Sequence, residues 1–264
     1  MHRVSRVDDS AEINLMIPII TSIWKNTSIR SELADTLRAV AYNGGLVLHV
    51  TDNDEERAIL IGSPGHKLGK TYLYARIFLI KDHSRTTIQS MLFAHLKQWA
   101  LENDYNRIVT EIDPFNLGEV SFYFEKTCPI SIEPVLLDVV HDHAEQRGRY
   151  QCLRILLDLP VDLTCAKNEP AFANVDPVAI EEINLEPSRY VNLSVVGLQV
   201  PSNIDEMRRL DPWAASRAEK AAYDAFQSLV KSGFMMTGLL NGTTPLYLFM
   251  RKLPVVVQSK DSVV

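Results

Sequence analysis

Residues 72–80 read YLYARIFLI, a run of aromatic, β-branched and leucine side chains that is typical of a strand. The run stops at the polar residues 81–85, KDHSR, and a long amphipathic helix is predicted after it. A second strand-like run, RIVTEI, covers residues 107–112, and residues 117–126, LGEVSFYFEK, predict a short helix. This part of the chain is therefore predicted to form a strand, a helix, a strand and a helix in succession.

Length and composition restrict the classes of protein to which this chain can belong. Its 264 residues suffice for one large domain or two small ones, and its hydrophobic fraction of 46% is ordinary for a globular protein. The net charge of −6 gives no basic footprint for a duplex nucleic acid. No apolar run is long enough to cross a bilayer, and Cys128, Cys152 and Cys165 lack metal-ligand spacing. We expect a cytoplasmic protein with reduced thiols, no metal site and no membrane partner.

Turn and breaker residues predict where the remaining elements of the first half end. Gly44 and Gly45 indicate the end of a helix, and a hairpin follows with strands at residues 46–50 and 58–61. Residues 62–70 contain three glycines and are expected to form a loop, in which a lysine could meet a substrate. A strand is expected at 130–140, broken by Pro134, and a polar loop at 141–148.

The second half is predicted to form a C-terminal α/β subdomain that packs on or extends the sheet of the first. Residues 160–187 are rich in proline, asparagine and acidic residues, which indicates a boundary between a domain at 1–160 and another at 161–264. A helix is predicted to begin at Asp211 or Pro212 and to run through Lys231, stopped by Gly233. A hairpin around Asn241 and Gly242 follows it.

The order of elements at residues 72–126 resembles the acyl-CoA-binding core of the GNAT acetyltransferase superfamily. The resemblance extends over residues 24–250 and is closest to a bacterial GNAT-like family with a C-terminal extension. It implies a mixed α/β fold with a mostly antiparallel sheet flanked by helices. The blocks that carry it outside the core are AYNGGLVL at 41–48, GKTYLY at 69–74, DPF at 113–115, VPSNI at 200–204 and GFMMTGL at 233–239.

The resemblance implies an acyl-CoA co-substrate, bound between the first strand of the core and the N-terminus of the next helix. In the superfamily a glycine-rich loop lets backbone N–H groups approach the pyrophosphate. Here Ile88 stands at the first glycine of that loop, so we expect weakened or altered binding of acyl-CoA. The residues implied to contact the cofactor are Phe78, Leu79, Ile80, Arg85, Thr86, Thr87, Ile88, Gln89 and Ser90.

Two residues are candidates for the catalytic acid and base. Tyr123 stands near the tyrosine that, in the superfamily, protonates the departing CoA thiolate; an aromatic core residue is the alternative interpretation. Glu111 is the candidate base that removes a proton from the amine; Asp113 and His83 are further candidates, and Asp113 could instead cap the following helix. Arg76 interrupts an apolar strand, so a buried guanidinium there needs a partner, either Glu111 or an acidic substrate.

Transfer of an acyl group from a thioester to an amine of a small molecule is the function that the resemblance implies. Tyr74 and Arg76 are expected to contact that substrate, and Lys67 or Lys70 could also reach it. Loss of the glycine-rich loop leaves two alternatives open. One is an enzyme with another donor, such as aminoacyl-tRNA or a carrier-protein thioester, or with another reaction; the other is a non-catalytic binding protein. A homodimer is compatible with all three.

Overall fold

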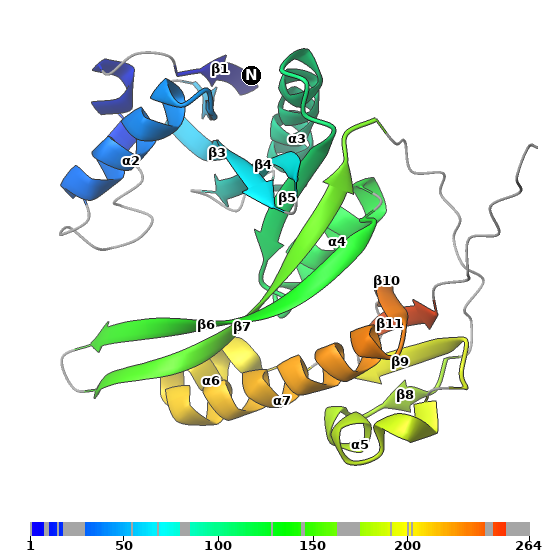
Figure 1. Ribbon diagram of the computed structural model, residues 1–264. Helices are drawn as coiled ribbons and strands as arrows, with labels where there is room; N and C mark the ends of the chain where they lie inside the picture. The colour runs from blue at the N-terminus through cyan, green and yellow to red at the C-terminus, as the bar shows by residue number, and fades with distance from the viewer. Residues whose placement is uncertain are drawn as a thin grey trace, which may run out of the picture. The chain divides into compact units, whose positions relative to one another are not determined.

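The chain divides into two compact units (Figure 1), which are described separately. The first unit comprises Met1–Ile112, Phe122–Glu133 and Ile155–Lys167, and the second comprises Asp113–Ser121, Pro134–Arg154 and Asn168–Val264. The domain boundary expected near residue 160 stays a prediction. The computed structural model describes residues 2–7, 11–14, 16–17, 30–53, 55–67, 69–79, 85–127, 129–143, 146–162, 175–190, 192–199, 201, 203–240 and 245–251.

A seven-stranded sheet has the strand order β1-β2-β3-β4-β5-β7-β6; the first unit holds β1 to β5 and the parts of β6 and β7 up to Glu133 and from Ile155. Neighbours from β1 to β4 pair antiparallel, as do β5 and β7, whereas β4 and β5 pair in parallel. The expectation of a mixed, mostly antiparallel sheet flanked by helices is confirmed. The strands are β1 (His2–Arg6), β2 (Leu46–Asp52), β3 (Glu55–Lys67), β4 (Lys70–Leu79), β5 (Arg107–Ile112), β6 (Ser131–His143) and β7 (Gln146–Pro160).

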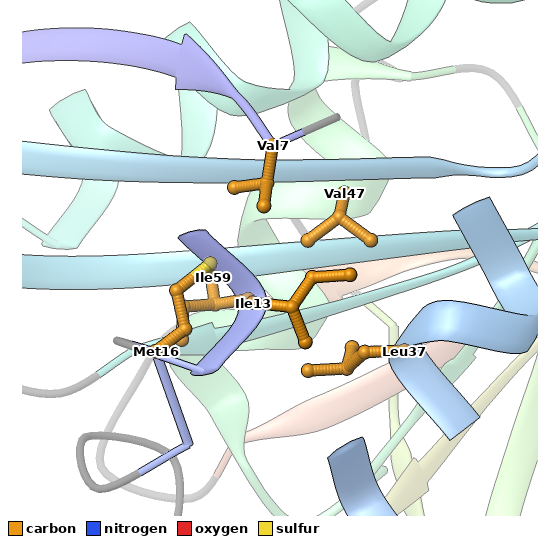
Figure 2. Packing of buried hydrophobic residues seen from close by; sticks show 6 residues of the cluster. All are labelled: Val7, Ile13, Met16, Leu37, Val47 and Ile59. Carbon is orange, nitrogen blue, oxygen red and sulfur yellow. The ribbon is translucent and has the colours of Figure 1, made fainter. Parts of the chain in front are cut away.

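Among the described residues, helices cover one face of this sheet over β2 and β3. The cover consists of α2 (Arg30–Tyr42) and of helical residues at 11–14 and 16–17. Figure 2 shows how their side chains meet those of β2 and β3. Each member of this cluster is at most 2% exposed, so truncating one to alanine should cost about 2–5 kcal/mol. The members are Val7, Ile13, Met16, Leu37, Val47 and Ile59.

The opposite face is covered by α3 (Arg85–Glu102) and α4 (Leu117–Lys126). The helix α3 buries Ile88, Leu92 and Leu96, a stripe at spacing i, i+4, i+8, and packs on β3, β4 and β5. Its Phe93 ring meets those of two α4 residues, Phe122 and Tyr123, edge to face. The predicted succession of strand, helix, strand and helix is therefore confirmed as β4, α3, β5 and α4.

Two expected loops are strand instead. The loop expected at 62–70 is wrong, because β3 continues to Lys67 and pairs with β4 without a register shift up to Lys67 and Lys70. Gly65 fits that strand because the ring of Tyr72, its cross-strand partner, lies over it. The polar loop expected at 141–148 is also wrong, because β6 runs to His143 and β7 begins at Gln146.

Pro134 does not break β6. It lies within the strand, and β6 is at the edge of the sheet. A proline has no N–H group to donate, and this loss is tolerated in a strand that has a neighbour on one side only.

The second unit has a four-stranded sheet in the order β10-β11-β9-β8, with four helical segments. The predicted hairpin of β10 and β11 is confirmed, while its turn lies outside the described residues. The predicted helix α7 is also confirmed, whereas α6 was not expected. The elements are β8 (Pro177–Val178), α5 (Ile180–Leu185), η2 (Pro187–Tyr190), β9 (Val195–Gln199), α6 (Ile204–Leu210), α7 (Pro212–Lys231), β10 (Phe234–Leu240) and β11 (Leu246–Arg251).

Side chains of α7 take the place of a strand along part of β7. The backbone N–H of Gln151 donates to Oγ of Ser216 at 3.0 Å, and that of Leu153 donates to Oε2 of Glu219 at 2.5 Å. Residues 151 and 153 belong to the part of β7 that precedes Ile155, and this part does not pair with β5. The carboxylate of Glu219 is 1% exposed and satisfies a backbone donor that would otherwise be buried without an acceptor. No helix in the described part of the chain is long and apolar enough to cross a membrane.

Candidate functional site

The central feature of the first unit is the point where β4 and β5 stop pairing. Their parallel register ends at Ala75 and Thr110, although β4 continues to Leu79 and β5 to Ile112. Each strand keeps its outer neighbour over that length, since β4 stays paired with β3 and β5 with β7. The two backbones therefore diverge within an otherwise continuous sheet, and their inner edges have no strand partner beyond that point in the described residues.

Glu111 follows this divergence point immediately and faces the side of the sheet that bears Tyr74 and Arg76. Its Oε2 accepts a hydrogen bond from the Tyr74 hydroxyl at 3.0 Å, and its Oε1 lies 3.7 Å from Nη2 of Arg76. The predicted pairing of Arg76 with Glu111 is confirmed, but the expectation that Arg76 is buried is wrong, because its side chain is 47% exposed. Burial and the nearby carboxylate of Glu111 raise the pKa of Tyr74 to about 12, so its phenol stays a donor.

A cavity of about 410 Å³ lies on the same face, next to Glu111; we call it the open-face pocket. Its walls include the rings of Tyr72 and Tyr74 from β4 and the apolar side chains of Val109 and Leu156. The position follows from the coverage of the sheet, because α2 and the first helical residues pack on β2 and β3 of this face. The charged and polar residues that line the pocket are Lys67, Lys70, Arg107, Ser131, Glu133 and Asp158.

An ion pair reaches across the open-face pocket. Nζ of Lys67 on β3 lies 2.9 Å from Oε2 of Glu133 on β6, and three strands separate β3 from β6 in the sheet. Four strand spacings would amount to about 19 Å on a flat sheet, which two side chains cannot bridge. The sheet therefore curls around this face. A second pair, Arg107 with Asp158, lies within the pocket, with Nε of Arg107 2.8 Å from Oδ1.

Tyr123 lies on the other face of the sheet, at the level of the divergence point. Its side chain is 2% exposed, and its hydroxyl is 3.4 Å from Oγ1 of Thr110, the last residue of β5 that pairs with β4. Phe93 and Phe122 pack against its ring. This burial is what the interpretation as a core residue expects, while the position next to Thr110 is what an acid at the divergence point would need.

The residues implied to contact acyl-CoA lie at the end of β4 and in the first turns of α3. Arg85 to Ser90 are helical, so the expectation of a loop there is wrong. Thr86, Thr87 and Ser90 are exposed, whereas Ile88 and Gln89 are at most 3% exposed. Phe78 and Leu79 belong to β4, and Ile80 and His83 lie outside the described residues. No acidic side chain stands in the first turn of α3, where free N–H groups attract anions.

Asp113 is held by arginine side chains of the second unit. Its carboxylate accepts hydrogen bonds from Arg208 at 2.6 and 3.2 Å and lies 3.4 Å from Nη1 of Arg154. It also accepts from the N–H of Phe115, a local turn that leads toward α4. The N–H of Glu119 in the first turn of α4 donates instead to Oδ1 of Asn116 at 3.3 Å, so Asn116 and not Asp113 caps this helix. Within the described residues, no group of three or more His, Cys, Asp or Glu side chains could hold a metal ion.

Sequence reasoning did not identify most of the open-face pocket. Tyr72, Val109 and Leu156 were not expected there, nor were Arg107 and Asp158. Strand alternation places residues 72, 74 and 76 on one face, and this signal could have found Tyr72. The residues of β6 and β7 could not be found in this way, because their place beside β5 depends on the sheet order.

Three solved structures illustrate what this chain is similar to. A GNAT-family acetyltransferase from Streptococcus pneumoniae is 12% identical, with a TM-score of 0.44, over 61% of this chain and 99% of that one. A protein from Salmonella typhimurium proposed to be an acetyltransferase, solved with its cofactor acetyl-CoA, is 11% identical, with a TM-score of 0.46, over 64% and 98%. The ribosomal-protein-S18-alanine N-acetyltransferase from Escherichia coli is 14% identical, with a TM-score of 0.41, over 63% and 98%.

No protein-family model matches the chain, and no curated protein does. The similarity to solved structures is too distant to bear on substrate or activity.

Proposed function

We propose that this protein transfers an acyl group from a thioester, with acyl-CoA as the donor, to a primary amine. The observation that carries the proposal is the divergence of β4 from β5 with Glu111 beside it. Backbone groups on the inner edges of two diverging strands can pair with the amides of an extended thioester arm, as a strand would. The N-terminus of α3, free of acidic side chains, suits the phosphates at the other end of such a donor.

The chemistry needs a base on the amine and an acid on the departing thiolate. The neutral amine attacks the thioester carbonyl; a C–N bond forms as the C–S bond breaks, and no covalent enzyme intermediate is required. Glu111 accepts the proton that the ammonium loses, directly or through a water molecule. Tyr123 donates its phenolic proton to the thiolate. Because Thr110 and Glu111 point to opposite faces of β5, these two roles fall on opposite sides of the divergence point.

The burial of Ile88 removes the main objection to acyl-CoA as the donor. An isoleucine in place of glycine would block the phosphates if its side chain lay over the first turn of α3. Ile88 is 0% exposed and belongs to the stripe that packs on the sheet. The outward positions of this turn hold Thr86 and Thr87, whose hydroxyl groups can donate hydrogen bonds to a phosphate.

Binding of the donor is tested by the shift of the melting temperature with acetyl-CoA, CoA and longer acyl-CoAs. A ligand at 100 times its Kd stabilises the fold by about 2.7 kcal/mol, which raises Tm by several degrees. Transfer is then tested by the release of free thiol with a panel of primary amines. A shift together with amine-dependent thiol release supports the proposal. The absence of a shift at millimolar acyl-CoA would instead favour another donor or a binding protein.

A further inference from the structure

The open-face pocket holds one cation that its own acids leave unneutralised. Lys67 pairs with Glu133, and Arg107 pairs with Asp158. Lys70, which begins β4 and also lines the pocket, has no ion-pair partner among the described residues. The pair across the rim is weak, because both side chains are more than half exposed, so an incoming anion can compete for Lys67 as well. The rim near the β3–β4 turn therefore favours an anionic group.

The charge and polarity of the side chains on this face change along β4. Lys70, Tyr72, Tyr74 and Arg76 lie on one face at successive alternate positions, and Glu111 stands level with Arg76. A ligand lying along this face would meet Lys70 at one end, two aromatic rings in the middle and the ion pair of Glu111 with Arg76 at the other end. Between the rings and the opposite wall, Val109 and Leu156 add apolar surface.

The length of such a ligand follows from the strand geometry. Positions 70 and 76 are about 20 Å apart, since a strand rises about 3.3 Å per residue. Side chains that lean along the strand can cover up to about half of that span between Lys70 and Glu111. The remaining distance is roughly 10 Å, which is the length of three extended residues of a peptide.

We propose that the open-face pocket binds the acceptor, and that this acceptor is an amine with an anionic group about 10 Å from its nitrogen and an apolar or aromatic body between them. This inference rests on the proposed acyl transfer, which places the amine at Glu111. Lys70 then binds the anionic end and fixes which amines are accepted. A polyamine fits less well, because both acids that line the pocket are already paired with cations.

The test is calorimetric binding of two probes that differ only in one charge. They are the tripeptide alanyl-phenylalanyl-alanine and its C-terminal amide, both with a free N-terminal amine; spermidine is a third ligand. Titrations are made without any thioester, so the result does not depend on acyl transfer. The variants are Lys70→Ala and, as a control, Lys126→Ala, which removes an exposed lysine of α4 outside the pocket.

We expect the free acid to bind about tenfold more tightly than the amide, and we expect Lys70→Ala to abolish that difference while Lys126→Ala preserves it. Equal binding of acid and amide, tighter binding of spermidine, or binding of neither peptide would overturn the inference. Acyl transfer to amines without the anionic group, undiminished in Lys70→Ala, would overturn it and leave the proposed function intact. Peptide binding without any effect of acyl-CoA on Tm would instead contradict the proposed function alone.

Discussion

Two clusters of arginine and carboxylate side chains in this protein differ in burial and in the distances between their charged groups. In the first unit, Glu111 lies 3.7 Å from the guanidinium of Arg76, which is 47% exposed. In the second unit, Arg208 binds Asp113 at 2.6 Å and the buried Glu219 at 2.8 Å. Burial alone would lower the pKa of Arg208, but its hydrogen bonds to Glu219 and Asp113 raise it, so this cation never titrates near neutral pH.

The difference teaches which carboxylate can take part in chemistry. Glu219 accepts hydrogen bonds from Arg208 and from the N–H of Leu153, and little of its surface is open. Glu111 accepts a hydrogen bond from Tyr74 at 3.0 Å and lies 3.7 Å from the guanidinium of Arg76, which is 47% exposed. A carboxylate beside a cavity and an exposed cation can be reached by a substrate, while a carboxylate buried between two elements holds them together.

The comparison predicts the largest effect for Glu111→Gln. Loss of a general base lowers the rate of acyl transfer about 10²–10⁴-fold, and the amide can still accept the hydrogen bond of Tyr74, so the fold should survive. The measurement is kcat/KM for thiol release, beside a denaturation curve. Glu125→Gln, at an exposed position of α4, is the matched control. Full activity in Glu111→Gln would remove Glu111 from the mechanism.

Glu219→Ala is predicted to lower the stability of the fold. Removing one partner of a buried ion pair leaves Nε of Arg208 and the N–H of Leu153 without an acceptor, which should cost about 3–5 kcal/mol of the free energy of unfolding. Urea denaturation measures the loss, and Glu206→Ala, an exposed acid of α6, should change it by less than about 0.5 kcal/mol. A Glu219→Ala variant as stable as the parent would mean that this cluster does not hold α7 to β7.

A smaller effect is predicted for Gly65→Ala, which sharpens the picture of the pocket wall. A Cβ at this position would lie 2.4 Å from a ring atom of Tyr72, so the ring has to move. We expect a loss of about 1 kcal/mol in stability, because the ring is free to rotate toward the cavity. The free energy of binding of the peptide acid should fall by more than the free energy of unfolding does. The paired readouts are calorimetry and thermal unfolding, and unchanged binding would separate Tyr72 from the ligand.

The smallest effect concerns pH and Tyr74. Its pKa is raised from 10 to about 12 in the folded state by burial and by the carboxylate of Glu111. A raised pKa gives stability that is complete below pH 10 and is lost as the pH rises toward 12. As the pH rises from 10 to 12, the free energy of unfolding should therefore fall less in Tyr74→Phe than in the parent protein. Ultraviolet titration of the phenol checks the assignment, and an ordinary tyrosine titration curve would refute it.

The periodic parts of the fold could be predicted from the sequence, and so could one pair of the site. The alternation in β4 and β5 and the helical stripe of α3 led to the correct succession of elements, and Glu111 was one of the two partners expected for Arg76. Gly62 and Gly65 were misleading, because glycine usually indicates a loop. Gly65 is tolerated in β3 only because Tyr72 covers it, and that depends on the register of another strand.

The divergence of β4 and β5 could not be predicted in the same way. Residues 77–79 are of the types found in strands that pair on both sides, and β4 stays paired with β3, and β5 with β7, where their own pairing has ended. The pocket depends likewise on the curl of the sheet that brings Lys67 to Glu133. These features arise from the order and twist of several strands, which residue types do not encode locally.

The substitution of α7 side chains for a missing strand also bears on how this chain avoids self-association. A strand with unpaired N–H groups is a template on which another chain can add its own strand, the first step toward aggregates. The side chains of Ser216 and Glu219 accept hydrogen bonds from two such N–H groups on β7, so a strand of a second molecule cannot pair with them. Variants that lose these acceptors should therefore precipitate on heating before they melt reversibly.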